Sequence, residues 1–194
     1  LPMIPGPSHT WYIDKLIEEG ISFAGCDQGE VRGSPASIQR FTEFYNEMVK
    51  RGYSKKPALL GQSRGGLMML SWAVRNPNKV GAFAGIYPVQ NLRSWPIKRN
   101  LSATLHDFEM DEKTFFQMID EHNPINHLAG MAKAQVPVFI LHGDSDKVVP
   151  FEENTRVVQE KYQELGGKVE VEIAPGAGHQ VLDTFFKSKN LIEF

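Results

Sequence analysis

The sequence has 194 residues and a formal net charge of −2, with 41% hydrophobic and 23% charged side chains. This length fits one domain with a sizeable core, and the composition is that of an ordinary globular protein. A nucleic-acid-binding surface needs clustered lysines and arginines, so we expect no nucleic-acid partner. No apolar run has the length of a membrane span, so we expect no spanning helix.

Cys26 is the sole cysteine, which excludes an intrachain disulfide. It ends an apolar run, and we expect it to pack rather than to react. The chain does not open with a basic segment followed by an apolar one, so no signal peptide is predicted. Neither observation decides between a secreted and a cytoplasmic protein, and the localisation stays open.

The first third of the chain contains patterns of helices, strands and loops. Prolines and Gly6 predict a loop over residues 1–9. Apolar residues from Ile13 to Ile17 predict a helix that ends at Gly20, and Ile21–Cys26 reads as a short buried strand. A glycine-containing loop over 27–33 follows. The next elements are a helix that starts at Ser34-Pro35 and ends at Gly52, a strand over Ala58–Leu60, a helix from Leu67 to Asn76 and a strand over Val80–Tyr87.

The stretch over 89–135 interrupts this alternation. Asp111 is expected to cap a helix whose apolar face includes Phe115, Met118 and Ile119. Two interpretations stay open. The stretch is either an ordinary crossover with extra turns or a small cap insertion beside the active site, because long connections in compact domains are often functional.

The last third returns to alternating elements. They are a strand over Val136–Gly143, a helix marked by Val158, Tyr162 and Leu165 and ended by Gly166-Gly167, a half-exposed edge strand over Val169–Ala174, and an amphipathic segment from Val181 to Phe186. The alternation predicts an α/β fold with a doubly wound, mostly parallel sheet flanked by helices, formed as a single domain over 1–194.

A Gly-x-Ser-x-Gly pentapeptide, Gly61-Gln62-Ser63-Arg64-Gly65, lies between a predicted strand and a predicted helix. On such a turn the hydroxyl of Ser63 stands clear of its neighbours and can reach a substrate. The start of the helix adds partial positive charge where an oxyanion would form. The pentapeptide therefore predicts a nucleophilic serine.

Two further polar groups follow later strands. Asp144 and Asp146 come after Val136–Gly143, and His179 lies on a glycine-rich loop after the last strand. The carboxyl ends of parallel strands meet at one edge of a sheet, so these groups are expected near Ser63. A serine hydroxyl needs a base to take its proton, and an unperturbed histidine titrates near neutral pH.

In these motifs the sequence resembles the α/β-hydrolase superfamily, in which the triad runs in the chain order Ser, Asp, His. It looks most like the dienelactone-hydrolase and prolyl-oligopeptidase-type catalytic domains. The matching segments are Gly61 to Gly66, His142 to Pro150 and Gly176 to His179, and the resemblance extends over nearly the whole chain.

The resemblance implies a role for each residue. Ser63 would be the nucleophile and His179 the base, and Asp146 would orient the imidazole. The family pattern selects Asp146 over Asp144, for which we expect a turn-capping role. The backbone N–H of Arg64 would be one oxyanion donor. No residue is named for the second donor.

Other candidates have simpler interpretations. The side chain of Arg64 either binds an acidic substrate group or pairs with a nearby carboxylate, and we favour the pairing. Trp95 either stacks on a substrate ring or belongs to the core. His142 is expected to be a packed or hydrogen-bonded turn residue. The remaining histidines lack metal-ligand spacing, so we expect no metal and no cofactor.

The resemblance also implies two or three strands before Ile21–Cys26, and a strand between that segment and Ala58–Leu60. Either the sequence is a fragment of a longer protein, or these two segments pair directly in a minimal five-stranded hydrolase. An unpaired sheet edge would favour a dimer.

The predicted function is hydrolysis of a small-molecule carboxylic ester through an acyl-enzyme on Ser63, with acyl esters of carbohydrates as a first guess. The alternatives are a prolyl-oligopeptidase-type peptidase or a lactone hydrolase. A catalytically silent binding protein with the hydrolase fold is the alternative from another class.

Overall fold

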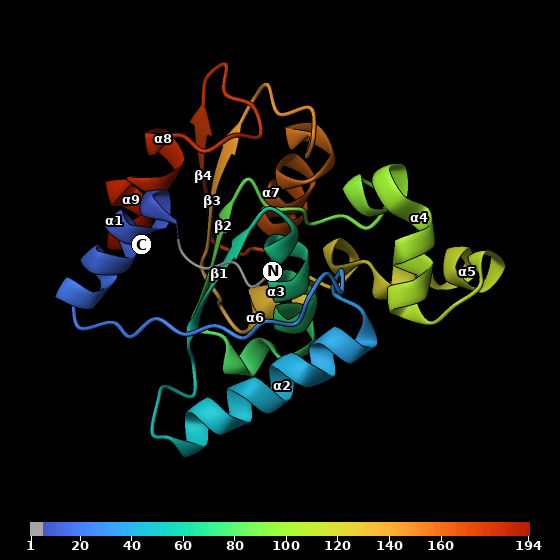
Figure 1. Cartoon of the computed structure of the whole chain (residues 1–194), viewed down its shortest axis with the longest axis horizontal. Helices are drawn as coiled ribbons and strands as arrows, with labels where there is room; N and C mark the ends of the chain where they lie inside the picture. The colour runs from blue at the N-terminus through green and yellow to red at the C-terminus, as the bar shows by residue number, and fades with distance from the viewer. Residues whose placement is uncertain (1–5) are drawn as a thin grey trace.

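The computed structural model describes residues 6–194 and contains a four-stranded parallel sheet between layers of helices (Figure 1). The strands lie in the order β1-β2-β3-β4, which are Ala58–Gln62, Ala82–Ile86, Val138–Gly143 and Val169–Ala174. Each strand is parallel to its neighbour, so their carboxyl ends lie at one edge of the sheet. The predicted α/β fold is confirmed, and β4 is an edge strand as expected.

The helices follow the predicted order closely. Their bounds are α1 Pro7–Glu18, α2 Pro35–Lys50, α3 Arg64–Arg75, α4 Trp95–Phe108, α5 Glu112–His122, α6 Ala129–Lys133, α7 Thr155–Glu164, α8 Asp183–Phe186 and α9 Lys189–Glu193. Short 3-10 turns lie at η1 Pro77–Lys79, η2 Pro124–Asn126 and η3 Phe151–Glu153. Ser34 caps α2 as predicted, because its side chain accepts from the backbone N–H of Ser37 at 3.4 Å.

One face of the sheet packs against α2, α3, α6 and α7; in Figure 1 α3 and α7 lie to the right of the strands and α2 lies below them. Trp72, Phe83 and Tyr162 are fully buried in this core. The indole N–H of Trp72 donates to the hydroxyl of Thr42 on α2 at 3.0 Å. Burial of these large side chains explains why α3 lies directly on the sheet and positions its first residue at the end of β1.

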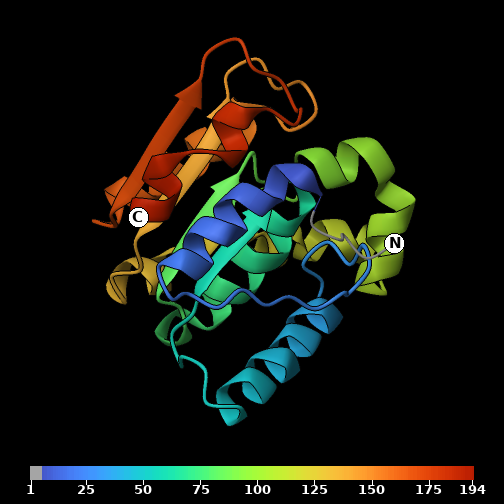
Figure 2. The same ribbon diagram turned by 60° about the vertical axis from the view of Figure 1, so that its left-hand side comes forward.

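The other face is covered by α1, α8 and α9, which lie together in both views (Figure 2). Tyr12, Phe185 and Phe186 pack there against Phe139 and Ala174 of the sheet. Helices on both faces make the sheet doubly wound, and this second layer brings the amino- and carboxyl-terminal segments of the described chain side by side.

A third apolar cluster joins α4 and α5 to the carboxyl-terminal edge of the sheet. Phe108, Phe115 and Ile119 contact Leu67 of α3 and Val149 of the loop after β3. The predicted cap of α5 is confirmed, because a carboxylate oxygen of Asp111 accepts from the Thr114 N–H at 3.0 Å. Whether α4 and α5 act as a substrate cap stays a prediction.

The predicted strand over Ile21–Cys26 is wrong. This segment has no regular structure, and the side chains of Ile21 and Phe23 are 49% and 45% exposed. Among the described residues β1 pairs with β2 alone, so the direct pairing expected of a minimal five-stranded sheet is wrong as well. A short apolar run becomes a strand only where a neighbouring strand satisfies its backbone hydrogen bonds.

Three smaller expectations also need correction. Cys26 is exposed, since the segment that carries it does not pack as a strand. Residues 1–5 of the predicted loop over 1–9 lie outside the described residues, while Pro7 begins α1 at a position where its missing N–H costs no bond. Leu165 is 47% exposed because α7 ends one residue before it, and Val181 is 57% exposed because α8 begins only at Asp183.

Gly61 allows β1 and α3 to approach closely, and we predict that Gly61→Ala destabilises the fold by about 1–3 kcal/mol. An added Cβ would lie 2.6 Å from the Cα and 2.9 Å from the N of Gly66, and neither backbone atom can move aside. Gly65→Ala is the matched control, since no atom lies within 4 Å of its added Cβ. Urea unfolding should separate the two variants, and equal midpoints would contradict the steric explanation.

Candidate active site

Ser63 lies on the turn between β1 and α3 in a backbone conformation that L-residues rarely adopt. Its φ is 48° and its ψ is −122°. The Ser63 N–H donates to the Ile86 carbonyl at 3.0 Å, and the Ser63 carbonyl accepts from the N–H of Gly66 at 2.9 Å and of Val89 at 2.8 Å. These bonds maintain the strained turn, and strained residues of this kind cluster at functional sites.

The structure brings Ser63, His179 and Asp146 into one hydrogen-bonded row. The Oγ atom of Ser63 lies 2.8 Å from His179 Nε2, and His179 Nδ1 lies 2.7 Å from Asp146 Oδ2. The three side chains come from the turn after β1, the loop after β4 and the loop after β3. The parallel sheet therefore gathers the predicted residues at its carboxyl-terminal edge.

Asp146 is buried, with 5% of the residue exposed. Its Oδ1 accepts from the backbone N–H groups of Val148 and Val149, each at 2.8 Å. Burial raises the pKa of Asp146, but the hydrogen bonds from His142, His179 and the Val149 N–H outweigh it and hold the pKa well below its usual range. The side chain is therefore an anion at neutral pH and holds Nδ1 of His179 as the donor.

The lowered pKa of Asp146 predicts a loss of stability in acid. A carboxyl group whose pKa is depressed in the folded state stabilises the fold above its unfolded pKa of about 3.9. That contribution is lost as the pH falls below about 5 toward the folded pKa. Urea unfolding at pH 7 and pH 3 should show a larger acid-induced loss for the unmodified protein than for Asp146→Asn, and equal losses would contradict this assignment.

His142 at the end of β3 and Asp144 in the loop after it have structural contacts. His142 is fully buried, with Nδ1 2.6 Å from the hydroxyl of Thr155 and Nε2 2.9 Å from the carbonyl of Val149, as predicted for a packed turn residue. Asp144 accepts from the Gly176 N–H at 2.7 Å. It therefore binds a backbone amide as expected, but it joins the loops after β3 and β4 rather than capping its own turn.

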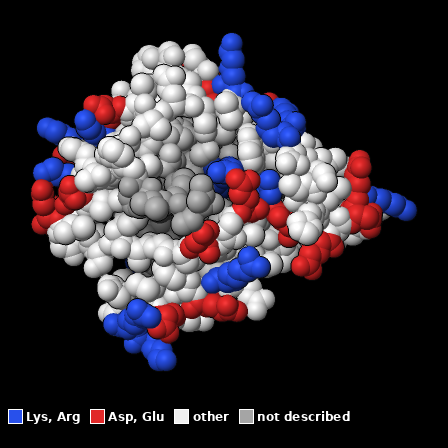
Figure 3. Space-filling model, viewed as in Figure 1, with Lys and Arg blue, Asp and Glu red and all other residues white. Residues whose placement is uncertain are grey.

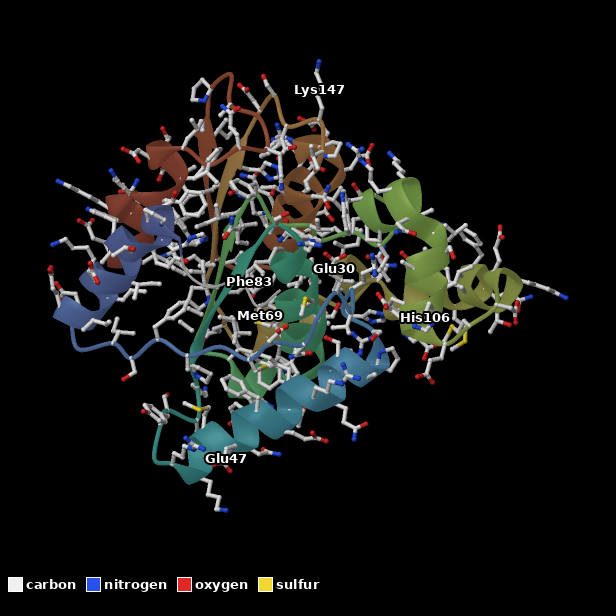
Figure 4. All side chains as sticks on the ribbon, in the orientation of Figure 1. Glu30, Glu47, Met69, Phe83, His106 and Lys147 are labelled. Carbon is white, nitrogen blue, oxygen red and sulfur yellow. The ribbon has the colours of Figure 1, made fainter. Side chains whose placement is uncertain are left out.

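Arg64 is the first residue of α3, so its backbone N–H points out of the helix start. Among residues 6–194 no carbonyl or side chain accepts a hydrogen bond from this N–H. The guanidinium of Arg64 forms an ion pair with Glu30, and Figure 4 labels Glu30 beside α3. The favoured pairing interpretation of the Arg64 side chain is thereby confirmed.

The loop over 27–33 connects this region to α4. Arg32, which is 6% exposed, pairs with Asp107 of α4 and lies 3.5 Å from a carboxylate oxygen of Glu30. Its guanidinium carbon lies 5.8 Å from the ring centroid of Trp95, a cation–π distance. Trp95 is half-buried at the start of α4 and contacts the third apolar cluster. Its substrate-binding role stays a prediction.

Sequence reasoning missed a contact to His179. The ring of Tyr87 lies 4.5 Å from the imidazole of His179, centroid to centroid, and its hydroxyl accepts from Gln62 Nε2 at 2.9 Å. Burial raises the pKa of Tyr87, so its phenol stays neutral. The sequence offered one weak signal, the position of Tyr87 at the end of a predicted strand. Gln62 occupies a variable position of the pentapeptide.

The described surface carries charged side chains of both signs. On the face in Figure 3, basic and acidic groups lie near one another. Exposed ion pairs of the described residues include Arg93 with Asp120 and Lys98 with Glu153. Among residues 6–194 there is no group of three or more metal-binding side chains. Within the same residues, no helix combines the length and apolar character needed to cross a membrane.

The model of the prolyl oligopeptidase family matches residues 35–192 of the chain. A puromycin-hydrolyzing peptidase from Mycobacterium tuberculosis is 19% identical, with a TM-score of 0.63 over 75% of this chain and 22% of that one. The acylaminoacyl peptidase of Pyrococcus horikoshii is 14% identical, with a TM-score of 0.61 over 79% and 26%. A thermostable esterase is 16% identical, with a TM-score of 0.56 over 80% and 35%.

These likenesses show a shared fold. The chain spans only 22% to 35% of the length of these solved proteins. No curated protein matches the sequence significantly.

Proposed function

Because this chain belongs to the prolyl oligopeptidase family, we propose that Ser63, His179 and Asp146 are the catalytic residues of a serine hydrolase. The observation that carries the proposal is the distance of 2.8 Å between Ser63 Oγ and His179 Nε2, with Asp146 bound to the opposite nitrogen. Three side chains in this geometry form an activated nucleophile.

The proposed reaction proceeds by acyl transfer. His179 Nε2 takes the proton of the Ser63 hydroxyl while Oγ attacks the substrate carbonyl carbon, and Asp146 stabilises the imidazolium that forms. The N–H of Arg64 donates to the developing oxyanion, which is typically worth about 3 kcal/mol. The imidazolium then protonates the leaving group. In the second half His179 takes a proton from water, the water attacks the acyl carbon, and the Ser63 oxygen leaves and is reprotonated by His179.

For the substrate, the family favours the peptidase alternative over the ester predicted first. We propose that the protein cleaves amide bonds of peptides. Carboxylic esters are the second candidate, because a thermostable esterase shares the fold and esters react by the same acyl-enzyme. Acyl esters of carbohydrates are a narrower form of this second candidate. A panel of chromogenic peptide amides and acyl esters, compared by kcat/KM, distinguishes them.

A fluorophosphonate probe tests the proposed nucleophile, since it forms a covalent bond only with an activated serine. We expect the unmodified protein to be labelled on Ser63, as located by peptide mass spectrometry, and Ser63→Ala to stay unlabelled. A folded protein that is not labelled would support the catalytically silent alternative. Equal labelling of Ser63→Ala would show that another serine is the nucleophile.

A further inference from the structure

Three polar side chains connect α1 to the ring that covers His179. His9 Nδ1 accepts from the Gly6 N–H at 3.1 Å, which leaves the imidazole proton of His9 on Nε2. That Nε2–H donates to Gln62 Oε1 at 2.9 Å. The amide of Gln62 is thereby oriented, and its Nε2 donates to the hydroxyl oxygen of Tyr87 at 2.9 Å. Each bond fixes the direction of the next.

Tyr87 is confined on several sides. Only 2% of the residue is exposed, its φ is 35°, and its N–H donates to the Leu141 carbonyl at 2.7 Å. Its ring meets the imidazole of His179 at an interplanar angle of 59°, while Phe185 packs against it edge-on at 5.0 Å. A bulky residue at positive φ is a backbone outlier of the kind found at functional sites.

From these contacts, and on the basis of the function proposed above, we propose that Tyr87 is a positioning residue for the imidazole of His179. The bond to Asp146 fixes one nitrogen of the ring but leaves it free to tilt, and the Tyr87 ring limits that tilt. Gln62 precedes Ser63 directly in the chain. The anchor of Tyr87 and the nucleophile therefore share one rigid turn, and His9 completes the anchor from α1.

The test measures how fast a fluorophosphonate labels Ser63 as the probe concentration is varied. Tyr87→Ala removes the ring, and we expect its maximum labelling rate to fall about 100-fold while the half-saturating probe concentration stays unchanged. Tyr87→Phe and Gln62→Met keep an aromatic ring at position 87 but remove its hydrogen bond to residue 62. We expect their maximum labelling rates to fall about 2- to 10-fold, the equivalent of one hydrogen bond.

Tyr162→Phe is the matched control. Tyr162 is also fully buried, and its hydroxyl donates to the Val136 carbonyl at 2.6 Å in the core on the other face of the sheet. Its loss should lower the unfolding midpoint without changing the labelling rate. As a second readout, the NMR signal of the His179 Nδ1 proton should broaden in Tyr87→Ala and stay sharp in Tyr162→Phe.

The outcomes separate this inference from the proposed function. If the unmodified protein is labelled but folded Tyr87→Ala reacts at the same rate, the positioning role is wrong and the proposed nucleophile stands. If Tyr87→Ala does not fold, Tyr87→Phe and Gln62→Met decide, and losses no larger than that of Tyr162→Phe overturn the inference. If the unmodified protein is not labelled, both proposals fail.

Discussion

Replacing His179 by alanine is expected to reduce kcat for an activated ester by about 10⁶-fold, the loss typical when the base of a serine triad is removed. His179 Nε2 lies 2.8 Å from Ser63 Oγ, so it is the group that takes the hydroxyl proton during attack. The prediction is checked by initial rates with a nitrophenyl ester. Circular dichroism shows whether the fold is intact, which we expect because His179 lies in a loop and not in a helix or strand.

His106→Ala is the control for removing an imidazole. His106 is exposed on α4, away from the sheet (Figure 4), and we expect its loss to leave kcat unchanged. Free imidazole added to His179→Ala should restore part of the rate if the missing group is a base. A His179→Ala variant that retains more than about one tenth of kcat would show that another group activates the serine, because a positioned base is typically worth at least 10²-fold.

The proximity of the three site residues could be predicted because it follows from the order of strands and helices. Alternating strand and helix patterns imply a parallel sheet, and a parallel sheet brings the residues after its strands to one edge. Ser63 directly follows β1, and Asp146 and His179 lie in the loops after β3 and β4, so their proximity needs only the correct order of elements. The choice of Asp146 over Asp144 came from the family motif, and the structure places Asp146 alone against the imidazole.

The rest could not be predicted because it depends on contacts between segments distant in sequence. Ile21–Cys26 has the composition of a strand, but a strand also needs a partner, and local sequence does not supply that information. The bond between Gln62 and Tyr87, and that between Gln62 and His9, join three separate elements. The partner of Arg64 lies in a loop whose path no periodicity describes.

Replacing Asp146 by asparagine is expected to lower kcat by about 10⁴-fold with little change in KM. The Oδ1 atom of Asn can still accept from Val148 and Val149, so the loop should keep its shape. Its Nδ2, however, would donate to His179 Nδ1, and the imidazole proton would move to Nε2. In that tautomer His179 faces Ser63 with a donor and cannot accept the hydroxyl proton.

Asp144→Asn provides a matched control within the same loop. Asp144 is exposed, and the Oδ1 atom of Asn can still accept from the Gly176 N–H, so kcat should change by no more than about twofold, as for an ordinary surface substitution. Both variants remove one negative charge two residues apart. A loss of kcat confined to Asp146→Asn therefore arises from the hydrogen bond to His179 rather than from the negative charge of the loop. Equal losses in both variants would show that Asp146 is not the acid of the triad.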